Sequence, residues 1–168
     1  MPPSGLAGQR TAEVAVSHYG FTSKPFSVAV TEISPALFTF TPGGSNQGAP
    51  LNYRFPGSYT PNSAENPAEP GSVVVLFATG SGKWEDDAGL DAAGISLAAR
   101  PFTAKPISLM IGGQSSRILY AGAAPYQTTS MLQINAYVPE GIGTGPQPVV
   151  LSIGGVDNAR QMAMIAIK

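Results

Sequence analysis

The chain has 168 residues, which is enough for one domain with a generous core or for one domain with an appendage. Its 9 basic and 10 acidic residues nearly balance, which argues against a protein that binds nucleic acid or anionic lipid through a basic surface. With no cysteine and one histidine, the chain has neither a disulfide framework nor the usual ligands of a zinc site.

Glycine and proline cut the chain into short segments. The 20 glycines and 16 prolines suit a sandwich or barrel of short strands. No apolar run approaches the roughly 20 residues of a membrane span, so we expect no membrane insertion. The first residues also lack the apolar stretch of a secretion signal. If the protein is exported, we expect this chain to be a mature fragment of a longer one.

The N-terminal part alternates polar and apolar residues over two short stretches. Residues 11–17 and 26–33 both show this alternation and are predicted to be strands. Residues 36–40 follow as a short aromatic strand. We interpret residues 1–25 as an N-terminal extension or added strand, and residues 26–168 as the sandwich domain.

The middle of the chain is less regular. Residues 41–71 are rich in Gly, Pro, Asn and Ser, and are predicted to be a long loop pinned by aromatics in residues 51–55 and at Tyr59. Residues 72–79 are continuously apolar, which predicts a central strand buried on both faces. Residues 80–105 are predicted to be a loop with one helical turn.

A strand-and-turn unit occurs twice in the second half, at residues 106–120 and 148–162. Each copy has an alternating run, a Gly-Gly pair and a second run, the pattern of a β-hairpin whose turn needs positive φ at both central residues. Residues 131–138 alternate strictly and predict a half-buried strand, and residues 160–168 predict a C-terminal strand. About nine or ten strands without βαβ spacing predict an all-β fold, an antiparallel β-sandwich.

Several motifs stand out between residues 30 and 168. They read Ile-Ser-Pro-Ala-Leu-Phe-Thr at 33–39, Asn-Pro-Ala-Glu-Pro-Gly-Ser-Val-Val-Val-Leu-Phe-Ala-Thr-Gly at 66–80, Ile-Gly-Gly at 111–113 and 153–155, Tyr-Ala-Gly-Ala-Ala-Pro at 120–125, and Leu-Gln-Ile-Asn-Ala-Tyr-Val-Pro at 132–139. Together they resemble an uncharacterised C-terminal domain that is abundant in exported proteins of Solibacter-type acidobacteria.

The resemblance implies an immunoglobulin-like module at the end of a long secreted or cell-surface protein. It implies no activity and no cofactor, and it carries over no catalytic residues. The chain departs from the family pattern at residues 83–87, Lys-Trp-Glu-Asp-Asp, where the family tends to have a Thr-Pro-rich loop. An individual function is therefore expected in this loop.

Catalysis has little support in the residues. A Ser-His-acid triad would need His18, the only histidine, and no Gly-x-Ser-x-Gly elbow is present, because Gly80-Ser-Gly82 is too short. We interpret His18 as an exposed structural residue. We therefore predict no catalytic residues and no enzyme activity.

One acidic cluster bears on metal binding: Glu85, Asp86, Asp87 and Asp91. Their oxygens suit calcium, but the spacing is not that of an EF-hand. The cluster is interpreted as a solvated loop, with a weak calcium site and a glycosidase-type carboxylate pair as alternatives. We predict no required metal or cofactor.

Four aromatic residues form a speculative ligand site: Trp84, Tyr53, Tyr59 and Tyr126. Exposed rings stack on sugar faces in carbohydrate-binding sandwiches. The alternative is that Trp84 folds back and covers the end of the sheet. Rings gathered on one exposed ridge would favour sugar binding, and buried rings would favour a structural role.

The prediction for function is a non-catalytic structural, adhesive or assembly module of an exported bacterial protein, located outside the cell or at its surface. The expected partner is a surface protein or polysaccharide, or other copies of the chain, and no nucleic acid. The alternatives are a carbohydrate-binding module and a small hydrolase. We also expect residues 11–16 to pair with a sheet edge of their own chain or of another copy, so that deleting residues 1–20 lowers the melting temperature or causes aggregation.

Overall fold

The computed structural model describes residues 4–6, 8–40, 46–84, 100–102, 104–128 and 131–168. These residues form strands β1–β17 and two short 3₁₀ turns, η1 (Ser4–Leu6) and η2 (Ala159–Gln161), with no α-helix among them. None of the described residues belongs to a helix long and apolar enough to cross a membrane. The prediction of an all-β fold is confirmed.

The first main sheet has the strand order β10-β13-β14-β9-β7-β8, with β5 beside β9, and all of its pairs are antiparallel. Its strands are β5 (Ala36–Leu37), β7 (Leu51–Arg54), β8 (Ser58–Pro61), β9 (Val73–Thr79), β10 (Arg100–Pro101), β13 (Ile118–Ala123) and β14 (Leu132–Tyr137). The continuous apolar strand β9 lies inside this sheet, between β14 and β7.

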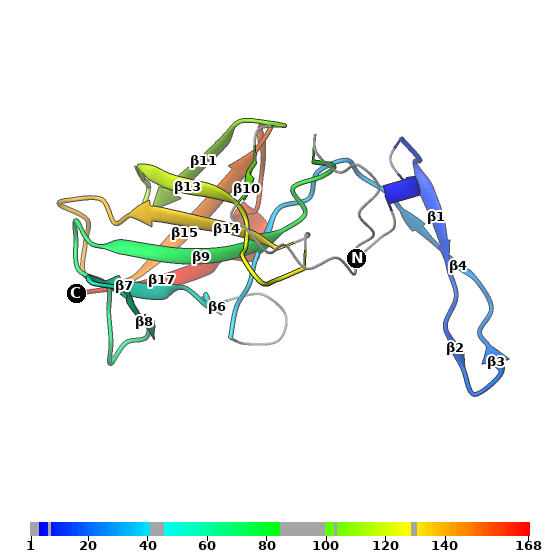
Figure 1. The fold of residues 1–168 in the computed structure, drawn as a ribbon, viewed down its shortest axis with the longest axis horizontal. Coiled ribbons are helices and arrows are strands. Elements are labelled where there is room, and N and C mark those ends of the chain that lie inside the picture. The colour runs from blue at the N-terminus through cyan, green and yellow to red at the C-terminus, as the bar shows by residue number, and fades with distance from the viewer. Residues whose placement is uncertain (1–3, 7, 41–45, 85–99, 103, 129–130) are drawn as a thin grey trace.

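The second main sheet has the order β12-β11-β15-β17-β6, with β16 beside β15, and only its β6–β17 pair is parallel. Its strands are β6 (Asn46–Gln47), β11 (Ile107–Ile111), β12 (Gln114–Ser115), β15 (Gly145–Ile153), β16 (Val156–Asp157) and β17 (Ala163–Ile167). The two sheets stack on one another (Figure 1), an arrangement consistent with a β-sandwich.

The core lies between the two sheets and follows from alternation along the strands. In β14, Leu132, Ile134 and Ala136 are completely buried, whereas the residues between them are half-exposed. The prediction that β9 is buried on both faces is only partly right. Its inward residues are buried, but Val73 and Phe77 on the outer face are half-exposed. Val75 lies between them on the same face and is 2% exposed, so the outer face of the first sheet is apolar and only partly open to solvent.

Both Gly-Gly turns have the predicted conformation. Gly112 and Gly113 have φ of 57° and 77°, and Gly154 and Gly155 have φ of 57° and 84°. The two copies of the unit are neighbours, because β11 pairs with β15. The first unit is not one long hairpin, however, because the chain leaves β12 after Ser115 and crosses to the other sheet as β13.

The predicted loop at residues 41–71 contains a hairpin, β7–β8, which extends the first sheet. Asn62 follows this hairpin and is completely buried. Its side-chain Oδ1 accepts a hydrogen bond from the Ala166 N–H (2.8 Å), and its Nδ2 donates to the Ala166 carbonyl (2.9 Å) and to Asn52 (3.0 Å). One asparagine therefore joins the first sheet to β17 of the second.

A second polar bridge joins the sheets near η2. Gln161 Oε1 accepts a hydrogen bond from the Leu37 N–H (2.8 Å), and its Nε2 donates to the Leu37 carbonyl. The buried Asn158 holds Gln161 in place by donating to its Oε1 (3.0 Å), and accepts from the Leu151 N–H (2.7 Å). The side-chain amides of Asn158 and Gln161 thus provide hydrogen-bond partners for backbone groups where strand pairing ends.

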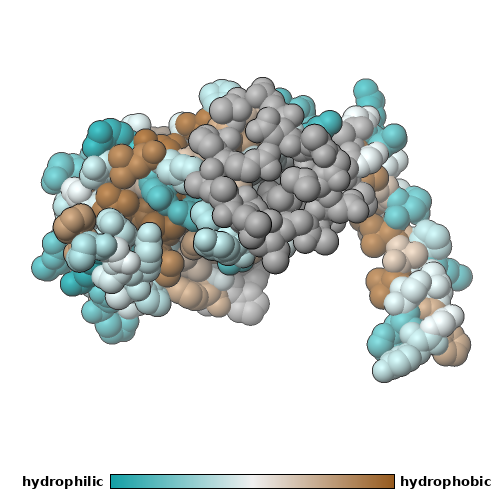
Figure 2. Space-filling view, in the orientation of Figure 1, coloured by the Kyte–Doolittle hydropathy of each residue, from teal (hydrophilic) through white to brown (hydrophobic). Residues whose placement is uncertain are grey.

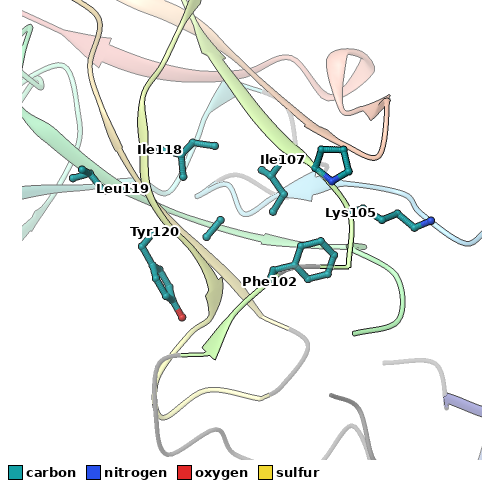
Figure 3. A pocket seen from close by; sticks show the side chains of 8 residues that line it. Phe102, Lys105, Ile107, Ile118, Leu119 and Tyr120 are labelled. Atoms are coloured by element: carbon teal, nitrogen blue, oxygen red, sulfur yellow. The ribbon is translucent and has the colours of Figure 1, made fainter. Parts of the chain in front are cut away.

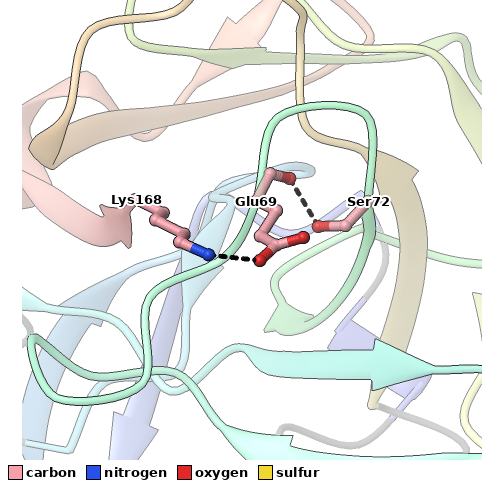
Figure 4. A network of polar contacts seen from close by, with 3 residues as sticks. All are labelled: Glu69, Ser72 and Lys168. Atoms are coloured by element: carbon pink, nitrogen blue, oxygen red, sulfur yellow. Dashed lines mark hydrogen bonds and ion pairs between the residues drawn. The ribbon is translucent and has the colours of Figure 1, made fainter.

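The C-terminal end is tied to the turn that precedes β9 (Figure 4). Lys168 Nζ lies 2.8 Å from Glu69 Oε1, and the Ser72 hydroxyl donates to the Glu69 carbonyl (2.6 Å). The hydrogen bond and charge of Lys168 lower the pKa of Glu69. Both side chains of the ion pair are exposed, so the contact contributes little stability.

The N-terminal strands form a separate arm of residues 11–29. Strand β1 (Thr11–Val14) pairs with β4 (Phe26–Ala29), and β2 (Ser17–His18) pairs with β3 (Phe21–Thr22) around a turn in which Tyr19 and Gly20 have positive φ. The arm projects from the sandwich at the end opposite the C-terminus (Figure 1). The predicted N-terminal strand thus pairs with β4, and not with an edge of either main sheet.

Candidate functional site

The two faces of the arm differ in chemistry. Cross-strand partners in a hairpin project to the same side, so Val14 with Phe26, and Ala12 with Val28, form one face. Glu13 opposite Ser27 lies on the other face, which is polar. The arm is therefore an amphipathic two-stranded sheet.

The apolar face of the arm is uncovered. Phe26 is 71% exposed and Val14 is 49% exposed, and Val16 and Phe21 nearer the tip are also exposed. Figure 2 shows hydrophobic atoms along the arm, which stands away from the body of the molecule. Isolated two-stranded hairpins are marginally stable in water. An arm of this kind gains stability when its apolar face packs against another surface.

The root of the arm is held firmly by the sandwich. Ile33 is buried in the core, the Ser34 N–H donates to the Gly80 carbonyl (2.9 Å), and Glu32 pairs with Lys105 (2.8 Å). At the base of the hairpin, the Val30 N–H donates to the Arg10 carbonyl (2.9 Å). The sandwich therefore fixes the point and direction from which the arm emerges.

Gly80-Ser81-Gly82, which the sequence analysis considered and rejected as a nucleophile elbow, forms the seat of this root. Gly80 has φ of 76°, and a Cβ added there would lie 1.8 Å from the Ser34 carbonyl oxygen. A Cβ on Gly82 would lie 2.7 Å from the Glu32 carbonyl oxygen. The buried Ser81 hydroxyl accepts a hydrogen bond from Trp84 Nε1 (3.0 Å). Ser81 has a structural role here.

A groove of about 430 Å³ opens where the sides of the two main sheets meet. Ile118 and Leu119 of β13, Ile107 of β11, and Phe102 line it, and Lys105 lies at its end (Figure 3). Ile107 and Ile118 also pack on the core. Because Lys105 pairs with Glu32, the groove begins beside the root of the arm.

A second hollow of about 210 Å³ lies on the outer face of the first sheet and shares Leu119 with the groove. Tyr53, Tyr59 and Val73 line it, with Asn135, and the two tyrosine rings are 5.3 Å apart. We name the combined surface the apolar strip. Its members are Ile107, Ile118, Leu119, Val73, Tyr53 and Tyr59. Figure 2 shows hydrophobic atoms over this part of the sheet.

The four rings of the predicted ligand site lie in different settings. The Trp84 ring packs edge-on against Phe102, with centroids 5.1 Å apart, and is partly buried against the core. Tyr53 and Tyr59 form a pair on the outer sheet face, and Tyr126 lies in a turn with 72% of its surface exposed. Trp84 therefore follows the alternative in which it folds back, and sugar binding by the tyrosines stays a prediction.

The remaining candidate residues are His18 and the acidic cluster. His18 is exposed near the tip of the arm, with its ring against that of Tyr19 at 4.3 Å. Glu85, Asp86, Asp87 and Asp91 lie outside the described residues. Within the described part of the chain, no group of three or more His, Asp or Glu side chains is placed to hold a metal ion.

The chain was compared with protein-family models, with curated proteins and with solved structures. None of the three comparisons found a match. The resemblance to the acidobacterial C-terminal domain therefore stays a prediction. The geometry of the arm and of the apolar strip has to carry the functional interpretation.

Sequence reasoning found the alternating strands of the arm, but it missed that they pair with each other and leave an apolar face exposed, and it missed the apolar strip. A signal for the arm was present, because Val14 and Phe26 are the apolar members of two alternating segments joined by a turn at Tyr19-Gly20. The strip had no such signal. Its members come from strands far apart in the sequence, and only the sheet order brings them together.

Proposed function

We propose that the protein is a non-catalytic assembly module that docks onto another protein through its N-terminal arm. One observation carries the proposal: the arm presents an apolar face on a rigid root, outside the core of its own chain. Exposed apolar patches of this kind mark interaction surfaces in soluble proteins. An arm used only as a linker would have no need of a polar and an apolar face.

The proposal extends to the finer fold and the location. The sandwich is an immunoglobulin-like module of an exported bacterial protein, and acts outside the cell or at its surface without a cofactor. The paired sheets and the abundance of short strands support this assignment, as do the motifs shared with the acidobacterial domain. The balanced charge supports partners other than nucleic acid.

Site-specific photocrosslinking of the full chain tests the docking role. A photoreactive phenylalanine analogue replaces Phe26 on the apolar face, and the matched control carries it at Ser27 on the polar face. The chain is irradiated in cells of the organism that produces it, and crosslinked peptides are identified by mass spectrometry. We expect position 26 to crosslink to a defined protein surface and position 27 to give little product. Equal crosslinking at both positions, or none at either, would overturn the proposal.

The second candidate is carbohydrate binding by the tyrosine pair. Tyr53 and Tyr59 stand beside a shallow hollow that also contains the Asn135 amide, a combination that can stack on and hydrogen-bond to a sugar. Titration with soluble oligosaccharides from bacterial and plant cell walls tests it. Binding that is lost in Tyr59→Ala and kept in Tyr126→Ala supports this candidate. Absence of binding in the unaltered chain removes it.

A further inference from the structure

We infer that the partner of the arm is a second copy of the same chain, and that two copies exchange arms around a two-fold axis. This inference rests on the proposed docking role and names the partner. In the dimer, the apolar face of each arm packs on the apolar strip of the other copy. The contact is one sheet laid on another, as in a sandwich.

Chemistry and size match between the arm and the strip. The apolar face of the arm and the outer face of the first sheet are both apolar surfaces on antiparallel sheets, with Val14, Phe26, Leu119 and Tyr59 exposed. Ile107 and Ile118, at the groove end of the strip, are half-buried against the core. From β13 to β8 the outer-face part of the strip crosses five neighbouring strands, a span of about 20 Å at ordinary strand spacing. The arm from Thr11 to its turn is about 30 Å long, at about 3.3 Å per residue. One arm is therefore long enough to cover the whole strip.

The position of the root favours exchange between copies. The arm leaves the sandwich beside Lys105, at the groove end of the strip, and points away from its own sheets (Figure 1). The contacts of Ile33 and Ser34 hold the root, and in this structure the arm lies away from its own strip (Figure 1). A two-fold axis near the root instead places each arm along the partner's strip with both roots unchanged.

The area of the contact favours a reciprocal pair. One face of the arm, about 30 Å by 10 Å, buries about 300 Å² on each partner, or about 600 Å² in all. That is below the roughly 1,200 Å² of a stable interface, whereas two symmetric contacts reach it. A single docked arm would give a weak, open chain of copies. Two exchanged arms give a closed dimer.

Sedimentation of the full chain over a micromolar concentration range tests the inference. We expect a monomer–dimer equilibrium with no larger species. Val14→Thr combined with Phe26→Thr removes apolar surface from the arm and keeps strand-forming residues, and should weaken dimerisation at least about tenfold. Leu119→Glu should do the same from the strip. The controls are Glu13→Thr on the polar face of the arm and Met110→Glu, an exposed apolar residue on the other main sheet.

Mixing the two weakened variants separates a docking defect from a folding defect. The Leu119→Glu chain keeps an intact arm and the Val14→Thr/Phe26→Thr chain keeps an intact strip, so one of the two contacts is restored only in the mixed pair. Because the mixed pair holds a single contact of about 600 Å², its heterodimer should form at a higher concentration than the unaltered dimer. A heterodimer of this weaker kind, formed while both variants alone stay monomeric, supports the exchange. A fully monomeric unaltered chain, or growth beyond the dimer, overturns it. If the chain is monomeric but Phe26 still crosslinks to another protein in cells, the docking role survives and only self-assembly fails.

Discussion

The sandwich and the arm are both built from strands that alternate polar and apolar residues, but their apolar faces are covered to different extents. In the sandwich, each apolar face meets the apolar face of the other sheet, and residues such as Ile134 and Leu151 are completely buried. In the arm, no second layer of described residues lies on the equivalent face, and Phe26 stays 71% exposed. An alternating pattern thus specifies a face to be covered, and the topology decides whether the chain itself or a partner covers it.

The largest effect should come from the polar bridge inside the sandwich. Asn62→Leu leaves two buried groups, the Ala166 N–H and Asn52 Oδ1, without the Asn62 side chain as partner, whereas the Ala166 carbonyl keeps its hydrogen bond from the Ala68 N–H. Each buried orphan costs about 1–3 kcal/mol, so we expect a loss of about 3–5 kcal/mol in the free energy of unfolding. Urea denaturation measures it, with Asn135→Ala on the half-exposed outer face as control. A loss equal to that of the control would show that the bridge is dispensable.

The next effect concerns the joint between the two regions. Gly80→Ala places a methyl group against the Ser34 carbonyl and forces alanine to positive φ, so we expect a loss of about 2–4 kcal/mol. Gly113→Ala has a similar φ of 77° but no atom within 4 Å, and should cost about 1 kcal/mol. Thermal melts measure both, and hydrogen exchange should show faster opening at residues 31–35 only for Gly80→Ala. If the two variants lose the same free energy of unfolding, the close approach of the Ser34 carbonyl to Gly80 adds no strain of its own.

Removal of the arm should barely change the sandwich. Residues 11–29 pair among themselves, so a chain that begins at residue 30 should melt within about 2 °C of the full chain at low concentration. The same deletion should abolish the dimer, and with it the concentration dependence of the melting temperature. This outcome differs from the drop expected from the sequence for a chain lacking residues 1–20. A large drop at low concentration would show that the arm braces its own sandwich.

The smallest effect is electrostatic. Because Lys168 lowers the pKa of Glu69 in the folded chain, the stabilisation by this pair is present above the ordinary pKa of a glutamate and is lost as the pH falls through the lowered value. Glu69→Gln should therefore reduce the melting temperature slightly at neutral pH, and this reduction should vanish once the pH has fallen below the lowered pKa of Glu69. High salt should shrink the neutral-pH difference, because the pair is exposed. A difference that persists in acid would point to the Ser72 turn instead.

The strands and turns that depend on a local residue pattern were predictable from the sequence. The alternation of residues 131–138 gave β14, and each Gly-Gly pair gave its turn, because these features depend on neighbouring residues. The crossing of β13 to the other sheet was not predictable in the same way. Gln114–Ser115 and Ile118–Ala123 read as one run, and the change of sheet depends on packing against the distant β14.

The candidate site was less accessible than the fold. The sequence offered Trp84, Tyr53, Tyr59 and Tyr126 as one speculative platform and a folded-back Trp84 as the alternative. The sequence alone does not decide between them, because the setting of each ring depends on tertiary contacts such as the Trp84–Phe102 pair. The loop at residues 41–71 hid a hairpin because its most important residue, Asn62, is polar and reads as loop composition. The two strands of the arm were predicted at residues 11–17 and 26–33, but their pairing with each other was not predicted.

Strand β17 contacts parts of the chain that are far away in sequence, and this determines the order in which the arm and the sandwich fold during synthesis. The arm pairs residues that are close in sequence, so its strands can meet as soon as a ribosome has released them, although the hairpin is only marginally stable until its apolar face is covered. The sandwich needs Ala163–Ile167, the last strand, to accept Asn62 and to pair with both β15 and β6. During synthesis the apolar face of the arm is therefore exposed before the sandwich of any copy has folded and formed the apolar strip. A chaperone or an export machinery that holds the nascent chain would have to shield residues 11–29 first.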